Sequence, residues 1–257
     1  MFQFRSARGA KGVWGKAMSL SSLKRPTAGN GQQPTKRPRE STSAVFKSFL
    51  VSICKSPCPP PKKHPRVPQG HIRVGTACGG WSSEIFALEH LKVKHAHVFD
   101  CDKESAVHRL VQHLHKPHIW YDDVTHDDFR TAPACDVFVA GFPCQPFSAA
   151  GLGRGMQDHR GLVVLYVVRY IKERKPTTWI LENVAGLFHQ HLDMLLAIIE
   201  ALTDITDDNS LPCYSISWRI LNARLHGGLP HNRERLFVVG TKKSVQKCPL
   251  TWPSEAA

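Results

Sequence analysis

From residue 71 onward the chain alternates between short apolar runs and longer amphipathic stretches, and this alternation restricts its fold more than any other feature. The apolar runs have the length and composition of strands and cover residues 72–76, 97–100, 119–121, 137–140, 178–181, 215–221 and 236–239. Helical spacing of apolar residues lies between them, at 83–92, 104–115, 162–173 and 187–202. This order predicts an α/β fold, in which a mostly parallel sheet has helices on both faces.

The run 137–140 reads Val-Phe-Val-Ala without a polar residue, which is typical of a strand buried on both faces. In open sheets of this kind, ligands bind beyond the carboxyl ends of the strands. The loops that follow the predicted strands are therefore where functional residues are expected.

Residues 1–70 differ in composition from the rest of the chain. They hold 14 Lys and Arg against one acidic residue, Glu40, and so carry the whole formal net charge of +13. They also hold 9 of the 18 prolines, with many Ser, Gly and Gln residues. Such a composition buries too little apolar surface to offset chain entropy. We expect a disordered basic leader over 1–70, followed by one folded domain over 71–257.

The leader allows several interpretations. Lys36-Arg37-Pro38-Arg39 fits a nuclear import signal or an arm that binds phosphates, and we expect a nuclear protein. Short basic runs are also common in tails that are only solvated. The first 39 residues are basic, contain serine and lack acids, as transit peptides of plastids and mitochondria do. The sequence leaves these alternatives open.

The apolar content and the cysteines restrict the class of protein further. No apolar run approaches the roughly 20 residues that a membrane span needs. The eight cysteines form no paired framework and show no zinc spacing; Cys54 and Cys58 are separated by three residues. We expect a reducing compartment and no structural metal.

Glycine or aspartate lies at the end of each of the first three predicted strands. The segments are Gly75-Thr76-Ala77-Cys78-Gly79-Gly80, Asp100-Cys101-Asp102 and Asp122-Asp123-Val124-Thr125. Glycines let the backbone approach a ligand closely, and an acid after the second strand commonly binds ribose hydroxyls. Each segment alone also fits a tight turn or a helix N-cap. Their repetition at three consecutive strand ends favours a nucleoside-binding site.

A cysteine segment, Gly141-Phe142-Pro143-Cys144-Gln145-Pro146-Phe147-Ser148, directly follows the buried run 137–140. Nearby N–H groups at such a turn can stabilise a thiolate, and the prolines stiffen the turn. A lone cysteine is more often a small core residue, but its polar, proline-rich surroundings oppose that here. The next strand ends in Leu181-Glu182-Asn183-Val184; Glu182 is either a neighbour of a helix cap or a functional acid. A thiol opposite a carboxyl group can add to a pyrimidine ring while binding its nitrogen.

Three motifs in this order and spacing resemble those of the cytosine-5 DNA methyltransferase family: Pro143-Cys144-Gln145, Glu182-Asn183-Val184 and Arg233-Glu234-Arg235. The resemblance spans about residues 72–239 and implies a Rossmann-like methyltransferase fold. It implies that Cys144 attacks carbon 6 of a flipped cytosine in DNA, whose carbon 5 takes the methyl group of S-adenosylmethionine. It also implies that Glu182 binds the ring nitrogen and amino group and Arg235 the carbonyl. Arg233 would brace the site, and Asn183 would shape the loop.

The same resemblance implies a cofactor site for S-adenosylmethionine. Its residues are Ala77, Cys78, Gly79, Gly80, Asp100, Cys101, Asp123, Pro143 and Val163. Residues 151–161, which contain Arg154 and Arg160, resemble the mobile loop that closes over DNA. The target base must leave the duplex, because carbon 6 is inaccessible within the stack.

The sequence departs from the family pattern in several places. Gly75 and Ala77 stand where an aromatic residue and a glycine are usual, and His231 stands where glutamine is usual. The chain reaches Ala257 soon after the last predicted strand, so we expect a catalytic domain without a target-recognition region, which a partner chain or a longer gene product would supply. Two alternatives stay open: methylation of transfer RNA with the same cysteine, and a non-catalytic, partner-dependent fragment.

Overall fold

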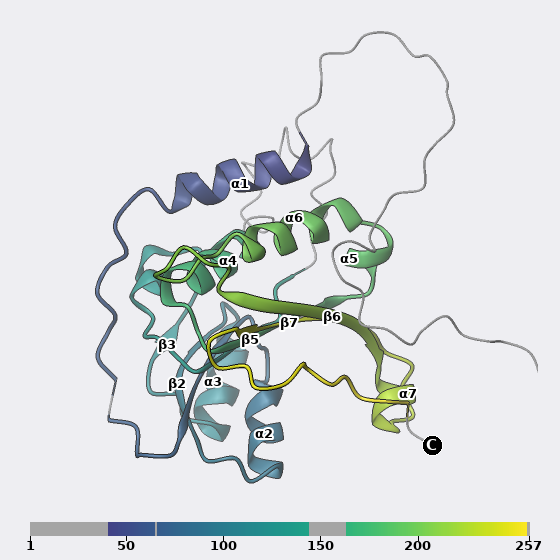
Figure 1. The fold of residues 1–257 in the computed structure, drawn as a ribbon. Coiled ribbons are helices and arrows are strands. Elements are labelled where there is room, and N and C mark those ends of the chain that lie inside the picture. Colours follow the sequence, from purple (N-terminus) through teal and green to yellow (C-terminus); the bar gives the residue numbers. More distant parts are fainter. Residues whose placement is uncertain (1–40, 65, 144–162, 256–257) are drawn as a thin grey trace, which may run out of the picture.

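A seven-stranded sheet forms the centre of the protein in the computed structural model, which describes residues 41–64, 66–143 and 163–255. The strand order is β3-β2-β1-β4-β5-β7-β6 (Figure 1). The strands are β1 (Ile72–Ala77), β2 (His95–Cys101), β3 (Trp120–Tyr121), β4 (Val137–Ala140), β5 (Thr178–Val184), β6 (Tyr214–Asn222) and β7 (Glu234–Lys242). Strands β1 to β5 pair in parallel, and β7 runs antiparallel to both β5 and β6. The prediction of a mostly parallel sheet is confirmed.

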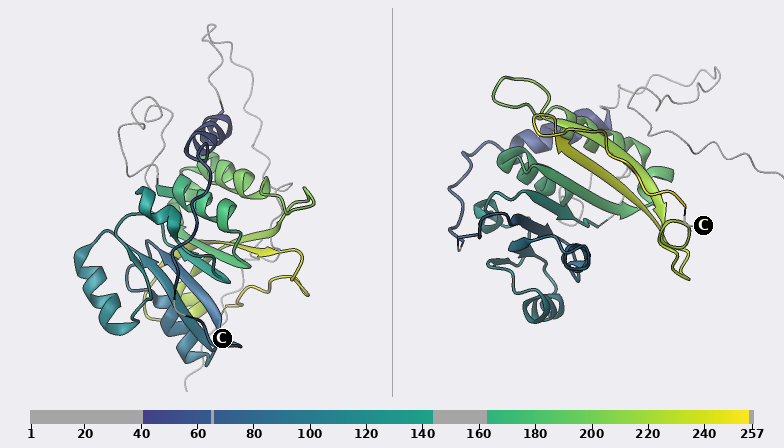
Figure 2. Two further views of the ribbon diagram at one scale, coloured as in Figure 1. Left: turned by 90° about the vertical axis from the view of Figure 1, so that its left-hand side faces the viewer. Right: turned by 60° about the horizontal axis from the view of Figure 1, so that its bottom comes forward.

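Helices cover both faces of the sheet, as predicted. On one face lie α2 (Ser83–His90) and α3 (Ser105–Leu114), and on the other lie α4 (Val163–Arg174), α5 (Gly186–His189) and α6 (Leu192–Thr203) (Figures 1 and 2). The short helices η2 (Asp127–Thr131) and α7 (Ala223–Gly227) lie in connections. Within the described ranges, no helix is both long and apolar enough to cross a membrane.

Three of these helices differ from the predicted pattern. The single helix predicted over 187–202 is divided into α5 and α6, because His191 between them has a non-helical backbone with φ −131° and ψ 42°. Helix α7 was not predicted; its five residues are too few to show a helical period.

The expectation of disorder over 1–70 does not hold for the part of that segment that the structure describes. A helix, α1 (Thr42–Ile53), begins after Ser41, whose side chain accepts a hydrogen bond from Ala44 N. It lies across the outer side of α4 and α6, away from the sheet (Figure 1). Phe46 and Leu50 are buried there, 3% and 5% exposed. Average composition misses this helix, because two large apolar side chains at i and i+4 are enough to attach one helix face.

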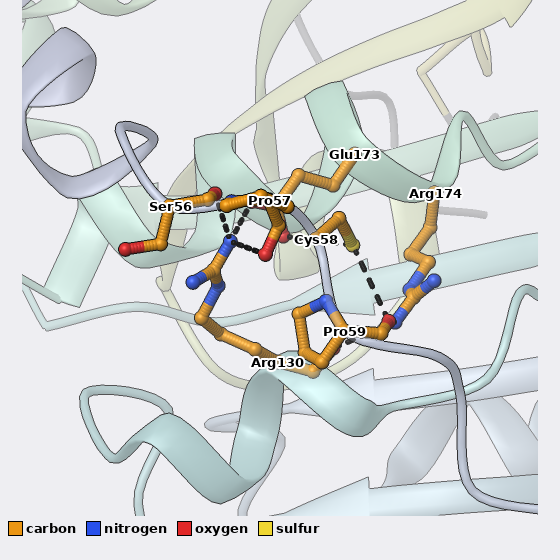
Figure 3. Close-up of polar contacts among 7 residues, drawn as sticks. All are labelled: Ser56, Pro57, Cys58, Pro59, Arg130, Glu173 and Arg174. Carbon is orange, nitrogen blue, oxygen red and sulfur yellow. Dashed lines mark hydrogen bonds and ion pairs between the residues drawn. The ribbon is translucent and has the colours of Figure 1, made fainter.

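The strap, residues 54–64, continues from α1 and is fastened to the domain by polar contacts (Figure 3). Arg130 Nη2 donates to Ser56 O at 2.9 Å and pairs with Glu173 Oε1 at 2.9 Å. Arg174 Nη2 donates to Pro59 O at 2.9 Å. The Arg130 and Glu173 side chains are only 9% and 12% exposed, so the backbone of the strap completes a largely buried ion pair. The strap is therefore part of the folded domain.

Candidate active site

A cavity of about 360 Å³ lies at the carboxyl ends of the parallel strands. It is lined by Cys78, Cys101, Asp102, Lys103, Asp123, Val124, Thr125, Gly141, Pro143 and Val163. These residues end or follow β1, β2, β3 and β4, except Val163, which begins α4. The volume lies in the range of pockets that bind small molecules. Segments after four strands thus meet at one site, where open α/β sheets bind their ligands.

The structure brings together part of the predicted cofactor set. Five of its members line the cavity: Cys78, Cys101, Asp123, Pro143 and Val163. The others, Ala77, Gly79, Gly80 and Asp100, do not; Ala77, for example, is buried in β1 beside Ala140. The lining residues outside that set are Asp102, Lys103, Val124, Thr125 and Gly141. All except Lys103 lie in the strand-end segments that the sequence singled out, and their place at a strand end is the signal that could have added them to the set.

Two carboxylates reach the cavity, and backbone N–H groups hold both of them. Asp102 Oδ2 accepts from Gly80 N at 3.3 Å and its Oδ1 accepts from Glu104 N at 3.0 Å, which ties the loop after β1 to the start of α3. Asp123 Oδ1 accepts from Thr125 N at 2.8 Å. Val124 and Val163 supply apolar surface beside these acids. Acids for hydroxyls and apolar side chains for a base fit a nucleoside, and with it the adenosyl part of S-adenosylmethionine.

Asp100 lies away from the cavity that it was predicted to line. It is still inside β2, and its side chain, 1% exposed, points between the sheet and the start of α2. There Oδ2 accepts from Ser82 Oγ at 2.5 Å and lies 3.4 Å from His97 Nε2. Burial raises the pKa of Asp100 to about 7. The acid that reaches the cavity from this strand end is Asp102, which lies beyond the last residue of β2.

Both cysteines that line the cavity carry neutral thiols. Burial, with the nearby carboxylates of Asp102 and Asp123, raises the pKa of Cys78 to about 12. Burial beside Cys78 also raises the pKa of Cys101. Because the thiolate is the reactive form of cysteine, neither is suited to be a nucleophile at neutral pH. Both residues therefore line the cavity as uncharged groups.

Glu182 and Arg235 meet at the same edge of the sheet. Arg235 Nε lies 2.8 Å from Glu182 Oε1, because β7 pairs antiparallel with β5 and sets Arg235 opposite Val184, two residues after the glutamate. Their side chains are 31% exposed for Glu182 and 23% for Arg235, so both are accessible to a substrate. A Cβ added at Gly141 would lie 3.5 Å from Glu182 Oε2. The ion pair therefore adjoins the cavity wall that Gly141 forms.

Asn183 connects the two central strand ends, whereas Arg233 stands apart. Asn183 is buried, and its Nδ2 donates to Phe142 O at 2.9 Å, while its Oδ1 accepts from Val184 N at 2.9 Å. It thus fixes the backbone two residues before Cys144. Arg233 is exposed, and its contacts within the described residues are made by its backbone, such as the bond from Ala223 N to its carbonyl oxygen at 2.9 Å.

Several predicted features lie outside the described residues. They are the nucleophile Cys144, the loop 151–161 with Arg154 and Arg160, and the basic run 36–39. In the part of the chain that is described, the seven cysteines are free, and no three His, Cys, Asp or Glu side chains are grouped so that they could hold a metal ion.

Comparison with known proteins adds the family context of this site. A family model for C-5 cytosine-specific DNA methylases matches residues 78–256. The Type II methyltransferase M.NgoBV of Neisseria gonorrhoeae is 36% identical over 148 residues, which are 57% of this chain and 35% of the relative. The Type II methyltransferase M.Bsp6I of Bacillus sp. (strain RFL6) is 35% identical over 173 residues, which are 66% of this chain and 49% of the relative. The chain thus spans about a third to a half of the length of these relatives.

A solved structure shows the same fold at low sequence identity. The S. pombe Dnmt2 methyltransferase superposes with a TM-score of 0.53 and 18% identity, over 71% of this chain and 52% of that one. At this identity the likeness concerns the fold: a mostly parallel Rossmann-like sheet with helices on both faces.

Proposed function

Because the chain belongs to the C-5 cytosine-specific DNA methylase family, we propose that it transfers a methyl group from S-adenosylmethionine to carbon 5 of cytosine in DNA. The observation that carries the proposal is the Glu182–Arg235 ion pair of 2.8 Å beside the cavity at Gly141. A carboxylate and a guanidinium side by side offer an acceptor and a donor to the polar edge of a cytosine. The cavity next to them has the size and polarity for a nucleoside cofactor.

The residues around the cavity fit S-adenosylmethionine. Asp102 and Asp123 would accept hydrogen bonds from its polar groups, and Val124 and Val163 would contact its base. The lack of a side chain at Gly141 keeps this part of the cavity wall uncrowded. A Cβ there would lie only 3.0 Å from the Cys78 carbonyl oxygen. When bound, the cofactor supplies a methyl group on a positively charged sulfur atom.

The chemistry on cytosine is assigned to three side chains. The thiolate of Cys144 forms a bond to carbon 6, which moves ring electrons toward carbon 5, where the methyl group is accepted. Glu182 accepts from the amino group and shares a proton with the ring nitrogen, and Arg235 donates to the ring carbonyl, so that both stabilise the charge that develops on the ring. A solvent base then takes the proton from carbon 5, which expels the Cys144 thiolate and restores the double bond between carbons 5 and 6.

The proposed substrate is DNA, which the description of the family names. A duplex hides carbon 6 in the base stack, so the target cytosine would have to be extruded. Transfer RNA is the alternative substrate for the same residues. Methyl transfer to duplex DNA and to transfer RNA, measured in parallel with radiolabelled S-adenosylmethionine, tests the choice; turnover on RNA alone would replace the proposed substrate.

The nucleophile is tested by substitution of Cys144. We expect Cys144→Ser to lower methyl transfer by at least about a thousandfold, because a serine hydroxyl is not ionised at neutral pH. Affinity for S-adenosylhomocysteine, measured by calorimetry, should stay within about twofold. Glu182→Gln should be impaired but active, since its amide still hydrogen-bonds the ring. Wild-type turnover in Cys144→Ser would assign the nucleophile elsewhere.

We also propose a nuclear location and a partner that supplies target recognition. The location rests on Lys36-Arg37-Pro38-Arg39, with a plastid or a mitochondrion as the alternatives. Imaging of the full chain fused to a fluorescent protein, beside a variant with those three basic residues changed to alanine, distinguishes them.

The proposed partner is tested by sequencing the positions that this chain methylates on random duplexes. A single strict sequence context would show that this chain reads DNA by itself.

A further inference from the structure

The loop after β1, residues 78–82, lies beside the cavity, and three of its residues have left-handed backbone conformations. Cys78, Gly80 and Ser82 have positive φ angles of 53°, 58° and 50°. Glycine adopts this left-handed region readily, but residues with a Cβ rarely do. The surrounding structure must therefore hold Cys78 and Ser82 in place.

The end of β2 holds this loop at every second residue. The bonds are Cys78 N to Cys101 O at 2.7 Å, Gly80 N to Asp102 Oδ2 at 3.3 Å, and Ser82 Oγ to Asp100 Oδ2 at 2.5 Å. The third bond differs from the others, because both of its partners are side chains and both are buried, at 0% and 1% exposed. Water therefore cannot replace either partner without opening the structure.

We propose that Ser82 and Asp100 are positioning residues that lock the loop 78–82 in the shape required for cofactor binding, although neither lines the cavity. The inference rests on the proposed function. Cys78, at the other end of the loop, does line the cavity, and its carbonyl oxygen lies 3.0 Å from the place that a Cβ at Gly141 would take. A shift of the loop therefore moves the part of the cavity wall that Cys78 forms relative to Gly141, which directly follows β4.

The groups that face Asp100 explain why a neutral side chain should replace it. His97 Nε2 lies 3.4 Å from Asp100 Oδ2 and 3.2 Å from Thr76 Oγ1, and Thr76 donates to Glu84 of α2 at 2.5 Å. Burial raises the pKa of Asp100 to about 7 and lowers that of His97 to about 3. Near neutral pH this cluster can hold Asp100 without a charge, and asparagine keeps an oxygen that accepts from Ser82.

Two measurements on the full chain test the lock. The first is the affinity for S-adenosylhomocysteine by calorimetry, and the second is amide hydrogen exchange of residues 78–82 without ligand. We expect Ser82→Ala and Asp100→Ala to weaken binding about tenfold and to speed exchange in the loop, since each removes one buried hydrogen bond. Asp100→Asn should restore both readouts to within about twofold of wild type.

Tyr214→Phe is the matched control for a general loss of stability. Its hydroxyl donates to Pro176 O at 2.8 Å in a buried place near the opposite ends of the strands, so this variant should change neither readout. If Ser82→Ala and Tyr214→Phe have the same affinity for S-adenosylhomocysteine and the same hydrogen exchange in residues 78–82, the proposed role of Ser82 and Asp100 is refuted. If the loop opens in Ser82→Ala but the wild-type chain binds no S-adenosylhomocysteine, the proposed function fails, and with it the link from loop to cofactor.

Discussion

At the scale of single residues, neighbouring acids in one strand end have opposite environments. Asp100 and Asp102 are separated by one residue, yet Asp100 is buried beside Ser82 and His97, and Asp102 lines the cavity. Burial disfavours the charged form of the first, whereas the second is held by two backbone N–H groups. Burial should therefore change the pH response of the Asp100 carboxyl group.

The pH dependence of stability follows from the raised pKa of Asp100. This carboxyl group loses its proton near pH 3.8 when unfolded and near 7 when folded, so between these values the folded protein binds one more proton. Its contribution to the free energy of unfolding is present below pH 3.8 and is lost as the pH rises through 7, by up to about 1.4 kcal/mol per pH unit. We expect Asp100→Asn to gain stability relative to wild type over this window, measured by urea unfolding at several pH values.

His97 contributes with the opposite sign. Its pKa is lowered from 6.5 to about 3, so it contributes stability above pH 6.5 that is lost as the pH falls toward 3. The free energy of unfolding of the wild-type protein contains both pH dependences. The quantity to measure is therefore the difference in this free energy between Asp100→Asn and wild type at each pH. A difference that stays constant from about pH 4 to 7 would mean that folded Asp100 keeps an ordinary pKa.

We predict that cofactor binding requires a residue without a side chain at position 141, where Gly141 stands. In Gly141→Ala the Cβ would lie 3.0 Å from the Cys78 carbonyl oxygen, tighter than ordinary contact with a backbone atom that cannot move freely. We expect affinity for S-adenosylhomocysteine to fall about tenfold. Gly186→Ala is the control, because its Cβ would make only an ordinary contact of 3.7 Å. Equal affinities of the two variants would contradict the close approach.

At the scale of elements, α1 and the strap belong to the folded domain although their composition resembles that of the basic leader. Phe46 and Leu50 join the core on α4 and α6, and Lys47 pairs with Glu200 and Asp204 of α6 at 2.7 and 2.6 Å. These ion pairs are exposed and contribute little. Burial of the two apolar side chains contributes roughly 3–6 kcal/mol, a large part of the stability of a typical domain.

Two deletions separate residues 1–40 of the leader from these elements. Deletion of residues 1–40 should leave the midpoint of thermal unfolding nearly unchanged, whereas deletion of 1–64 should lower it by several degrees or prevent folding, because the core loses Phe46 and Leu50. Phe46→Ala should show part of the same loss, and Val51→Ala, at a position 58% exposed in α1, should not. Equal stability of the two deletions would show that α1 is dispensable.

At the scale of the whole molecule, charge is divided unevenly along the chain. Residues 1–40 hold 9 Lys and Arg against Glu40, whereas residues 71–257 hold 20 basic and 20 acidic residues. Contacts between basic side chains and DNA phosphates release counterions, so they make affinity depend on salt. Residues 1–40 are therefore the part of the leader whose removal should change the salt dependence most.

We expect deletion of residues 1–40 to weaken binding to duplex DNA and to flatten the plot of log affinity against log salt by about 0.9 for each phosphate that the leader neutralises. Fluorescence anisotropy at several salt concentrations measures this slope, and unchanged affinity for S-adenosylhomocysteine is the control. A slope that the deletion does not alter would leave the leader with a targeting role only.

The sequence by itself determined the features that depend on local pattern. Short apolar runs that alternate with amphipathic stretches predicted strands and helices in the order of a mostly parallel sheet. The continuously apolar run 137–140 is typical of a strand inside such a sheet. The motifs around Cys144, Glu182 and Arg235 indicated the family, and the family model matches residues 78–256. Strand ends carrying Gly and Asp predicted where the cavity lies, because the ends of parallel strands share one edge of the sheet.

Only the tertiary structure decided which side chains face which surroundings. Asp100 and Asp102 are equivalent in the sequence, but the packing of α2 buries the first and leaves the second at the cavity. Phe46 and Leu50 lie in a segment of disordered composition, and the surface of α4 and α6 gives them a place to be buried. Burial is a property of contacts between segments that are distant in the chain, so a local pattern cannot specify it.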